Sequence, residues 1–142
     1  VLIMKKILVL VTFIILVLSI FYYREFEDYY ESGENDSFEI KVGQEFHIRL
    51  YENGSTGYSN CWLNEKNNPL LRKVKEEYSQ SLNARLGYIG SGGLIEMTFK
   101  GLKVGVDTVK IANCSFRDGE KCTDYNTENT KSDNEFIIKI TD

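Results

Sequence analysis

Residues 37–51, SFEIKVGQEFHIRLY, alternate apolar and polar side chains along most of their length. Phe38, Ile40 and Val42 occupy every second position, and the alternation resumes after a turn at Gly43-Gln44. A period of two is typical of a strand with one face in a core and the other in solvent. We therefore expect two half-buried strands joined as a hairpin.

The same alternation recurs downstream, in short stretches separated by Gly, Asn and Ser. We expect further strands at Cys61-Trp62-Leu63, from Val74 to Tyr78, and in residues 94–101, 104–114 and 135–140. Short strands with frequent turn signals, a single Pro and no convincing helix indicate an all-β protein. The pattern predicts an antiparallel β-sandwich of Greek-key type with about 7–8 strands.

An apolar run precedes this pattern. Lys5 and Lys6 stand before an uncharged stretch, residues 7–23, and an acidic segment follows it. This order is typical of an export signal. If the run is not cleaved, it is just long enough to span a bilayer core of about 30 Å, with its lysines on the cytoplasmic side. We expect an N-terminal apolar helix in residues 1–23, acting as a signal peptide or a signal anchor, a linker in residues 24–36 and one domain in residues 37–142.

Whether the apolar run is cleaved as a signal peptide or retained as an anchor, it directs the domain out of the cytosol. We expect it in the secretory pathway or at the cell exterior, as a secreted, vacuolar, lysosomal or periplasmic protein, with a membrane tether through residues 7–23 where the run is retained. The formal net charge of −4 repels phosphate backbones, which argues against nucleic-acid binding.

The chain has three cysteines, Cys61, Cys114 and Cys122. In an oxidising compartment we expect two of them to pair and one to be left over. Cys114 and Cys122 flank a short polar loop, so a Cys114–Cys122 disulfide is favoured, with Cys61 free. A Cys61–Cys114 pair remains open, because spacing alone does not fix connectivity. One His and three scattered Cys lack the spacing of a zinc site, so no metal or other cofactor is expected.

Catalytic groups are scarce. His47 lies on the polar side of an expected strand, as an ordinary surface residue does. A nucleophilic pair of Cys61 with His47 would need a third, orienting group, and nothing in the spacing supplies one. The carboxylates are scattered along the chain, as on a solvated face. We therefore expect that the chain is not an enzyme.

Three loops attract attention because each lies between two expected strands. They are ENGSTGYSN at 52–60, GYIGSGG at 87–93 and CSFRDGEKC at 114–122. Each alone reads as a turn or a flexible connection, since Gly and Asn-Gly supply turn dihedrals. In a Greek-key sandwich, however, alternate loops gather at one end. We expect these three to lie side by side and form a composite edge.

The loops resemble those of the chagasin-type inhibitors of papain-like cysteine proteases. That family carries N-P-[ST]-T-G-[FY], G-x-G-G and R-P-W motifs in this order. The first is matched at all positions but the Pro by Asn53, Gly54, Ser55, Thr56, Gly57 and Tyr58, and the second in full by Gly90, Ser91, Gly92 and Gly93. The resemblance runs from about Phe38 to the end of the chain and implies an Ig-like sandwich.

The third motif departs from the family pattern. Arg117 is followed by Asp118-Gly119, so the Pro and the Trp are missing. The resemblance leaves Phe116 and Arg117 as the residues of this loop that would contact a protease. Either Phe116 supplies the aromatic contact that the Trp gives in the family, or that contact is lost. The favoured Cys114–Cys122 bridge would restrict the loop before binding.

The resemblance implies a reversible, non-covalent, tight-binding inhibitor that wedges three loops into the protease cleft. Thr56 would lie nearest the catalytic Cys and His, and Tyr58 would pack at the base of the loop. The second loop would lie along the non-primed side, with the third loop on the other. We expect a monomer whose partners are cathepsin-like proteases of the papain class. The alternative is an Ig-like adhesion or ligand-binding module that has lost inhibition, as the missing Pro-Trp suggests.

Asn35, Asn53 and Asn113 each begin an N-x-S glycosylation sequon. A glycan on Asn53 would stand in the inhibitory loop and block its insertion.

Overall fold

The computed structural model of the chain describes residues 2–28, 37–116 and 119–142. The chain falls into a helical unit, Val1–Tyr30, and a β-rich unit, Glu31–Asp142. The helical unit is α1, Leu2–Asp28. It covers the expected apolar run and also residues 24–28, where a linker was expected; residues 29–36 of that linker lie outside the described residues. No helix in the described part of the chain is long and apolar enough to cross a membrane.

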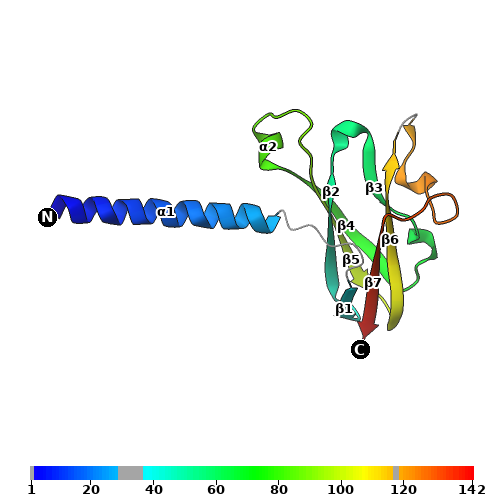
Figure 1. Cartoon of the computed structure of the whole chain (residues 1–142). Helices are drawn as coiled ribbons and strands as arrows, with labels where there is room; N and C mark the ends of the chain where they lie inside the picture. The colour runs from blue at the N-terminus through cyan, green and yellow to red at the C-terminus, as the bar shows by residue number, and fades with distance from the viewer. Residues whose placement is uncertain (1, 29–36, 117–118) are drawn as a thin grey trace. The chain divides into compact units, whose positions relative to one another are not determined.

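The β-rich unit is a sandwich of two sheets, as the alternating pattern predicted (Figure 1). One sheet has the order β1-β7-β6-β3 and the other has the order β2-β5-β4. The strands are β1 Ser37–Lys41, β2 Glu45–Glu52, β3 Tyr58–Trp62, β4 Leu71–Gln80, β5 Gly93–Gly101, β6 Gly105–Ser115 and β7 Asn134–Thr141. All the expected strand segments are therefore found, in a Greek-key, Ig-like arrangement.

The core lies between the two sheets and follows from the period of two. Along β5, Ile95, Met97 and Phe99 are all buried in the main apolar cluster. Trp62 of β3 meets Phe99 edge to face, with ring centroids 5.0 Å apart. Burying each such side chain contributes about 1.5–3 kcal/mol, so this cluster holds the two sheets together.

The expected hairpin of the first two strands is wrong. β1 pairs in parallel with β7, while β2 pairs antiparallel with β5 in the other sheet. The turn at Gly43 is the crossing point: Val42 N donates to Thr141 O, and Gly43 N donates to Gly101 O at 2.8 Å. Gly43 has φ 83°, which favours glycine. The turn thus bends the chain from one sheet to the other rather than reversing it within one sheet.

Among the residues that the structure describes, four short helical turns lie in the connections. They are η1 Gly54–Thr56, η2 Glu65–Asn67, α2 Leu82–Arg85 and η4 Cys122–Asp124. Three of them, η1, α2 and η4, lie in or beside loops that the sequence marks as functional. Of these, η4 lies in the connection between β6 and β7, where it carries Cys122.

Candidate functional site

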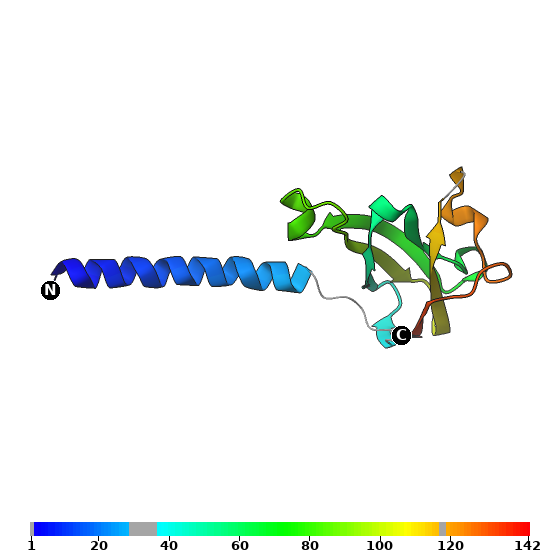
Figure 2. The ribbon, with the colours of Figure 1, turned by 45° about the horizontal axis from the view of Figure 1, so that its top comes forward.

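The topology brings the three marked loops to one end of the sandwich (Figures 1 and 2). The first loop, residues 53–58, carries the chain from β2 in one sheet to β3 in the other. β2 pairs with β5, so that Glu52 lies opposite Gly93 at the end of the second loop. β3 pairs with β6, so that Tyr58 lies opposite Ser115 at the start of the third loop. The first loop therefore lies between the other two.

The first loop is a single turn of 3-10 helix closed by its own side chains. Asn53 caps it: its Oδ1 accepts from Ser55 N at 3.3 Å and from Ser55 Oγ at 2.7 Å. Thr56 donates from its Oγ1 to Asn53 O at 2.7 Å. Gly57 ends the turn with φ 74°, a conformation that favours glycine. Asn is a preferred capping residue, so the sequence itself shapes this loop.

The tip of the first loop is open to solvent. Gly54, Ser55, Thr56 and Gly57 are all exposed, and so is Tyr58 at the start of β3. The tip carries no charge and no large side chain before Tyr58, which leaves a narrow polar projection.

A partly buried stem fixes the two ends of the first loop to each other. Glu52 Oε2 accepts from Ser59 Oγ and from Asn60 N, both at 2.8 Å. Asn60, buried in the domain, donates from Nδ2 to Tyr51 O at 3.0 Å. These bonds join β2 to β3, which belong to different sheets. A partly buried, satisfied polar network of this kind gives a stem a unique geometry.

The second loop is joined to the first through Asn53. Its Nδ2 donates to Gly90 O at 2.9 Å, while its Oδ1 accepts the capping hydrogen bonds from Ser55 in the first loop. Gly90 has φ 78° and is exposed, and Ser91 is half-buried.

The last two glycines of the second loop, Gly92 and Gly93, are buried and serve the fold. A Cβ on Gly92 would come within 2.5 Å of Glu52 O, and a Cβ on Gly93 within 2.0 Å of Ser79 O. Both distances are too short for any larger residue without a backbone shift. The backbone of β2 therefore passes close to Gly92, and that of β4 close to Gly93. Only Gly90 and Ser91 of this motif present an open surface.

The third loop is joined to the first by a backbone hydrogen bond. Phe116 N donates to Gly57 O at 2.8 Å, directly after β6 ends. The Phe116 side chain is half-buried and packs against a small cluster of Cys61, Leu63, Ala112 and Cys114. Arg117, the other expected contact residue of this loop, lies outside the described residues.

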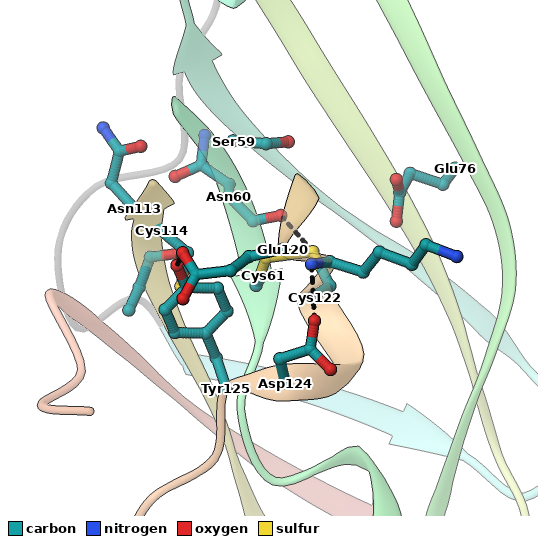
Figure 3. Close-up of a disulfide and its surroundings, with 12 residues drawn as sticks. Ser59, Asn60, Cys61, Glu76, Asn113, Cys114, Glu120, Cys122, Asp124 and Tyr125 are labelled. Carbon is teal, nitrogen blue, oxygen red and sulfur yellow. Dashed lines mark hydrogen bonds between the residues drawn. A yellow bond between two sulfur atoms is a disulfide. The ribbon is translucent and has the colours of Figure 1, made fainter. Parts of the chain in front are cut away.

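The expected Cys114–Cys122 disulfide is wrong, and so is the alternative Cys61–Cys114 pair. The bond joins Cys61 to Cys122, with a Cα–Cα distance of 5.2 Å, and Cys114 is a buried free thiol. Figure 3 shows the disulfide between Cys61 and Cys122, with Cys114 labelled on the neighbouring strand. Cys61 and Cys114 lie on neighbouring strands but are not opposite each other, because Cys61 faces Ala112 and Cys114 faces Ser59. η4 folds back over β3 and brings Cys122 to Cys61, so the bridge ties the third loop to the strand after the first loop.

The free thiol is not an activated nucleophile. Burial, followed by the charges of Asp133 and Glu120, raises the pKa of Cys114 to about 11. The thiolate is the reactive form, so Cys114 is protonated and inert at neutral pH. Beside it, Tyr125 donates from its hydroxyl to Glu120 Oε2 at 2.7 Å and also contacts Ser115 O. The hydrogen bond to Glu120 is the main cause that raises the pKa of Tyr125 to about 12.

The pair required for the enzyme hypothesis does not exist. Cys61 is in the disulfide, and His47 lies on β2, in the other sheet. There, His47 Nδ1 lies 3.1 Å from Thr98 Oγ1 and 3.3 Å from Glu96 Oε1. These are cross-strand neighbours on β5, as for an ordinary residue of a sheet surface. Within the described ranges, no group of acidic, His or Cys side chains is arranged to hold a metal ion.

Sequence reasoning missed one feature of this end of the sandwich. The segment between β4 and Gly90 carries four large apolar side chains that are exposed to solvent, Leu82, Leu86, Tyr88 and Ile89. A signal was present, since four apolar residues within eight positions are unusual for a loop. They lack the periodicity of a strand and carry no motif, so they read as part of a flexible connection.

Comparisons with known proteins agree with this architecture. Residues 39–138 match the family model described as Chagasin family peptidase inhibitor I42. A search of curated protein sequences found no significant match.

Two solved structures share the fold. The cysteine protease inhibitor EhICP2 from Entamoeba histolytica aligns with a TM-score of 0.53 and 18% identity, over 76% of this chain and 88% of that one. The solution structure of amebosin aligns with a TM-score of 0.52 and 20% identity, over 76% of this chain and 90% of that one. The family model covers most of the β-rich unit, and its members are peptidase inhibitors rather than enzymes. The chain belongs to the chagasin family of peptidase inhibitors.

Proposed function

We propose that this chain is a reversible, non-covalent, tight-binding inhibitor of papain-like cysteine proteases, which wedges its three loops into the active-site cleft. The observation that carries the proposal is the pair of hydrogen bonds on either side of the first loop, from Asn53 Nδ2 to Gly90 O and from Phe116 N to Gly57 O. These bonds make one edge out of three loops that are far apart in the sequence.

A joined edge suits inhibition because it is ordered before binding. The caps of the first loop, its partly buried stem and the two bridging bonds fix backbone that would otherwise lose entropy on docking. The narrow tip around Thr56 is small enough to enter a cleft. Thr56 would then lie nearest the catalytic Cys and His of the protease, with Ser55 and Gly57 beside it.

The flanking loops would contact the cleft on either side of this tip. Gly90 is exposed and Ser91 is half-buried, and the backbone of this loop would pair with a protease as the backbone of a substrate does. Gly92 and Gly93 act indirectly, because they let β5 begin at the correct distance from β2 and β4. Phe116 and Arg117 would contact the opposite side, since aromatic residues and Arg are common anchors of interfaces.

Blocking access requires no chemistry from the inhibitor. The one free thiol is buried and protonated, so no covalent bond to the protease is expected from it. Binding of this kind should be reversible and stoichiometric.

We also propose that the inhibitor acts as a monomer outside the cytosol, with residues 7–23 serving as a cleaved signal or as a membrane tether. The Cys61–Cys122 disulfide supports the compartment, because such bonds persist where the environment is oxidising.

The test is a titration of papain activity with the purified chain in non-reducing buffer. We expect a linear loss of activity that ends at one inhibitor per enzyme, and recovery of activity on dilution. Thr56→Arg places bulk and charge at the tip and should raise the inhibition constant at least a hundredfold. Thr127→Arg, the same change on an exposed loop between β6 and β7, should leave it unchanged.

A folded chain that inhibits neither papain nor several related proteases would contradict the proposal. It would favour the second candidate, an Ig-like adhesion or ligand-binding module. One observation supports that candidate: the Phe116 side chain is half-buried against its own domain rather than fully presented.

A further inference from the structure

The Cys61–Cys122 disulfide lies apart from the main core. Cys61 and Trp62 are neighbours on β3, so their side chains point to opposite faces of the sheet. Trp62 is in the apolar cluster between the two sheets, whereas Cys61 is in the small cluster on the outer face. Cys122 of η4 and Tyr125 directly after it pack against that small cluster. The disulfide therefore fastens η4 to the outside of the sandwich and does not hold the two sheets together.

This bond adjoins the bases of the first and third loops. Asn60, which precedes Cys61, donates from Nδ2 to Tyr51 O in the stem of the first loop. Cys122 Sγ lies 3.9 Å from Asn60 O (Figure 3). Phe116 of the third loop packs against the small cluster that contains Cys61. Release of Cys122 would therefore remove a support from both loops.

One end of the disulfide faces a route from solvent. Cys61 is 0% exposed, whereas Cys122 is half-buried. Cys122 helps to line a cavity of about 130 Å³, together with residues of η2 and of the chain after η4. Its other lining residues include Trp62, Leu63, Lys66, Tyr125 and Thr127. Such a cavity is smaller than the pockets that hold drug-sized ligands, so it suits a small thiol or a single side chain.

We propose that the Cys61–Cys122 disulfide is a redox switch: a small thiol enters this cavity, reduces the bond, releases η4 and thereby weakens inhibition. This inference rests on the proposed function. A papain-like protease uses a Cys thiolate as its nucleophile, so reducing thiols keep the enzyme active. The same thiols would loosen the inhibitor. Enzyme and inhibitor would thus respond to a reducing environment in opposite directions.

The reaction consists of two thiol–disulfide exchanges. A thiolate of the reductant attacks Cys122 Sγ and forms a mixed disulfide there, and Cys61 leaves as a thiolate that takes up a proton. A second thiolate attacks the reductant's sulfur in the mixed disulfide, and Cys122 leaves and is protonated in turn. Two electrons and two protons thus pass to the protein, and two thiol groups of the reductant become one disulfide. Cys114 takes no part, because its raised pKa keeps it protonated at neutral pH.

The first measurement is the rate at which dithiothreitol reduces the folded full chain. Samples are quenched with acid and alkylated in denaturant, and mass spectrometry then finds one labelled cysteine in the intact chain and three in the reduced chain. Direct attack requires a rate that is proportional to the dithiothreitol concentration and unchanged by urea below the unfolding transition. Thr127→Trp fills the cavity and should slow the reaction at least tenfold. The matched control is Val104→Trp, at an exposed residue beyond β5, which should leave the rate unchanged.

The second measurement is papain inhibition by the reduced chain after dithiothreitol has been removed. Reduction of the wild type should raise the inhibition constant at least tenfold, and reoxidation should restore it. The double variant Cys61→Ser/Cys122→Ser should resemble the reduced wild type before and after treatment, whereas Cys114→Ser should switch like the wild type. Circular dichroism should show that the reduced chain keeps its strands, because the main apolar cluster does not contain the bond.

The outcomes separate this proposal from the proposed function. An equal rate for wild type and Thr127→Trp, or a rate that follows global unfolding in urea, would overturn the route through the cavity. If the reduced chain inhibits like the oxidised chain, the bond is only structural and this inference alone fails. Loss of all strands on reduction would also overturn it, since the bond would then hold the whole fold. If the oxidised wild type inhibits no protease of the class, both proposals fail together.

Discussion

Asn53 connects two loops because the oxygen and the nitrogen of its side-chain amide both form hydrogen bonds. Oδ1 caps the first loop, and Nδ2 donates to Gly90 O of the second. Asn53→Asp retains an acceptor for the cap but replaces the donor with a carboxylate that faces a carbonyl oxygen. We expect the inhibition constant to rise about tenfold, with a loss of stability of only about 1 kcal/mol, typical of one hydrogen bond. Papain titration and thermal unfolding measure the two effects.

Asn53→Ala is the comparison for that variant, because it removes the cap as well as the bridge. It should destabilise the domain by about 0.5–2 kcal/mol more and should weaken inhibition at least as much. Equal inhibition by wild type and Asn53→Asp would show that the bridge to Gly90 does not position the second loop. The same amide is the acceptor of a glycosylation sequon, and a glycan on Nδ2 would displace the bond to Gly90. In an active inhibitor, mass spectrometry should therefore find Asn53 unmodified.

Single residues also show how far the sequence determined the site. The G-x-G-G motif was recognised, but the reason for Gly92 and Gly93 was not, because it depends on the backbone of β2 and β4. The cap at Asn53 follows from local preferences and was visible as a turn signal. The exposed apolar residues Leu82, Leu86, Tyr88 and Ile89 were missed because exposure is a property of the folded chain, and the four residues have no periodic pattern.

Strands were predicted more accurately than their partners. The period of two depends only on which face of a strand is buried, so every strand was found from its own residues. The partner of β1 depends on whether a turn reverses the chain within a sheet or crosses between sheets. Gly43 is compatible with either kind of turn. The crossing between sheets is fixed by hydrogen bonds from this turn to Gly101 O and Thr141 O, and these two residues are far away in the sequence. A local pattern therefore does not contain this information.

The disulfide was mispredicted for a similar reason. Cys114 and Cys122 are close in sequence, but Cys114 lies on β6, and η4 carries Cys122 across to Cys61 on β3. The correct pair spans 61 positions, and its geometry appears only once β3 and β6 are paired.

The disulfide that holds η4 to β3 should contribute to both stability and inhibition. Because the Cys61–Cys122 bond closes a long loop, it should stabilise the fold by roughly 2–4 kcal/mol. Cys61→Ser and Cys122→Ser should each lose about this much and should inhibit more weakly, since the connection after the third loop is no longer tied to β3. Denaturant unfolding measures the stability, and papain titration measures the inhibition.

Cys114→Ser is the matched control, because it changes the third cysteine and leaves the bond intact. It should retain most of the stability and the inhibition of the wild type. A reversed pattern, with Cys114→Ser destabilising and Cys61→Ser neutral, would show that the bond joins Cys114 to Cys122. Mass mapping of the non-reduced chain gives an independent answer.

At the scale of the whole β-rich unit, the sandwich brings distant loops together by crossing between sheets. The first loop joins β2 of one sheet to β3 of the other, and each of these strands pairs with a strand that borders another loop. The edge is therefore a consequence of topology, and the bonds at Asn53 and Phe116 fix its details. A change that weakens the sandwich should loosen all three loops at once.

Two weakly acidic side chains, Cys114 and Tyr125, make the free energy of unfolding of this unit depend on pH in the alkaline range. The pKa of Cys114 is raised to about 11 from an ordinary value of 9.0, mainly by burial. The pKa of Tyr125 is raised to about 12 from 10.0, mainly by its hydrogen bond to Glu120. The unfolded chain loses both protons at the lower values. The stability linked to these groups is therefore complete below pH 9 and is lost as the pH rises through 11 and 12.

We therefore expect the free energy of unfolding to be flat from pH 7 to 9 with respect to these groups and to fall steadily above pH 9. Cys114→Ser removes one of the two acids, so its stability should fall less between pH 9 and 11 than that of the wild type. Tyr125→Phe should reduce the fall at still higher pH. Denaturant melts at intervals of one pH unit measure the slopes. Parallel slopes for wild type and Cys114→Ser would show that this thiol ionises normally, and hence that it is not buried as the structure places it.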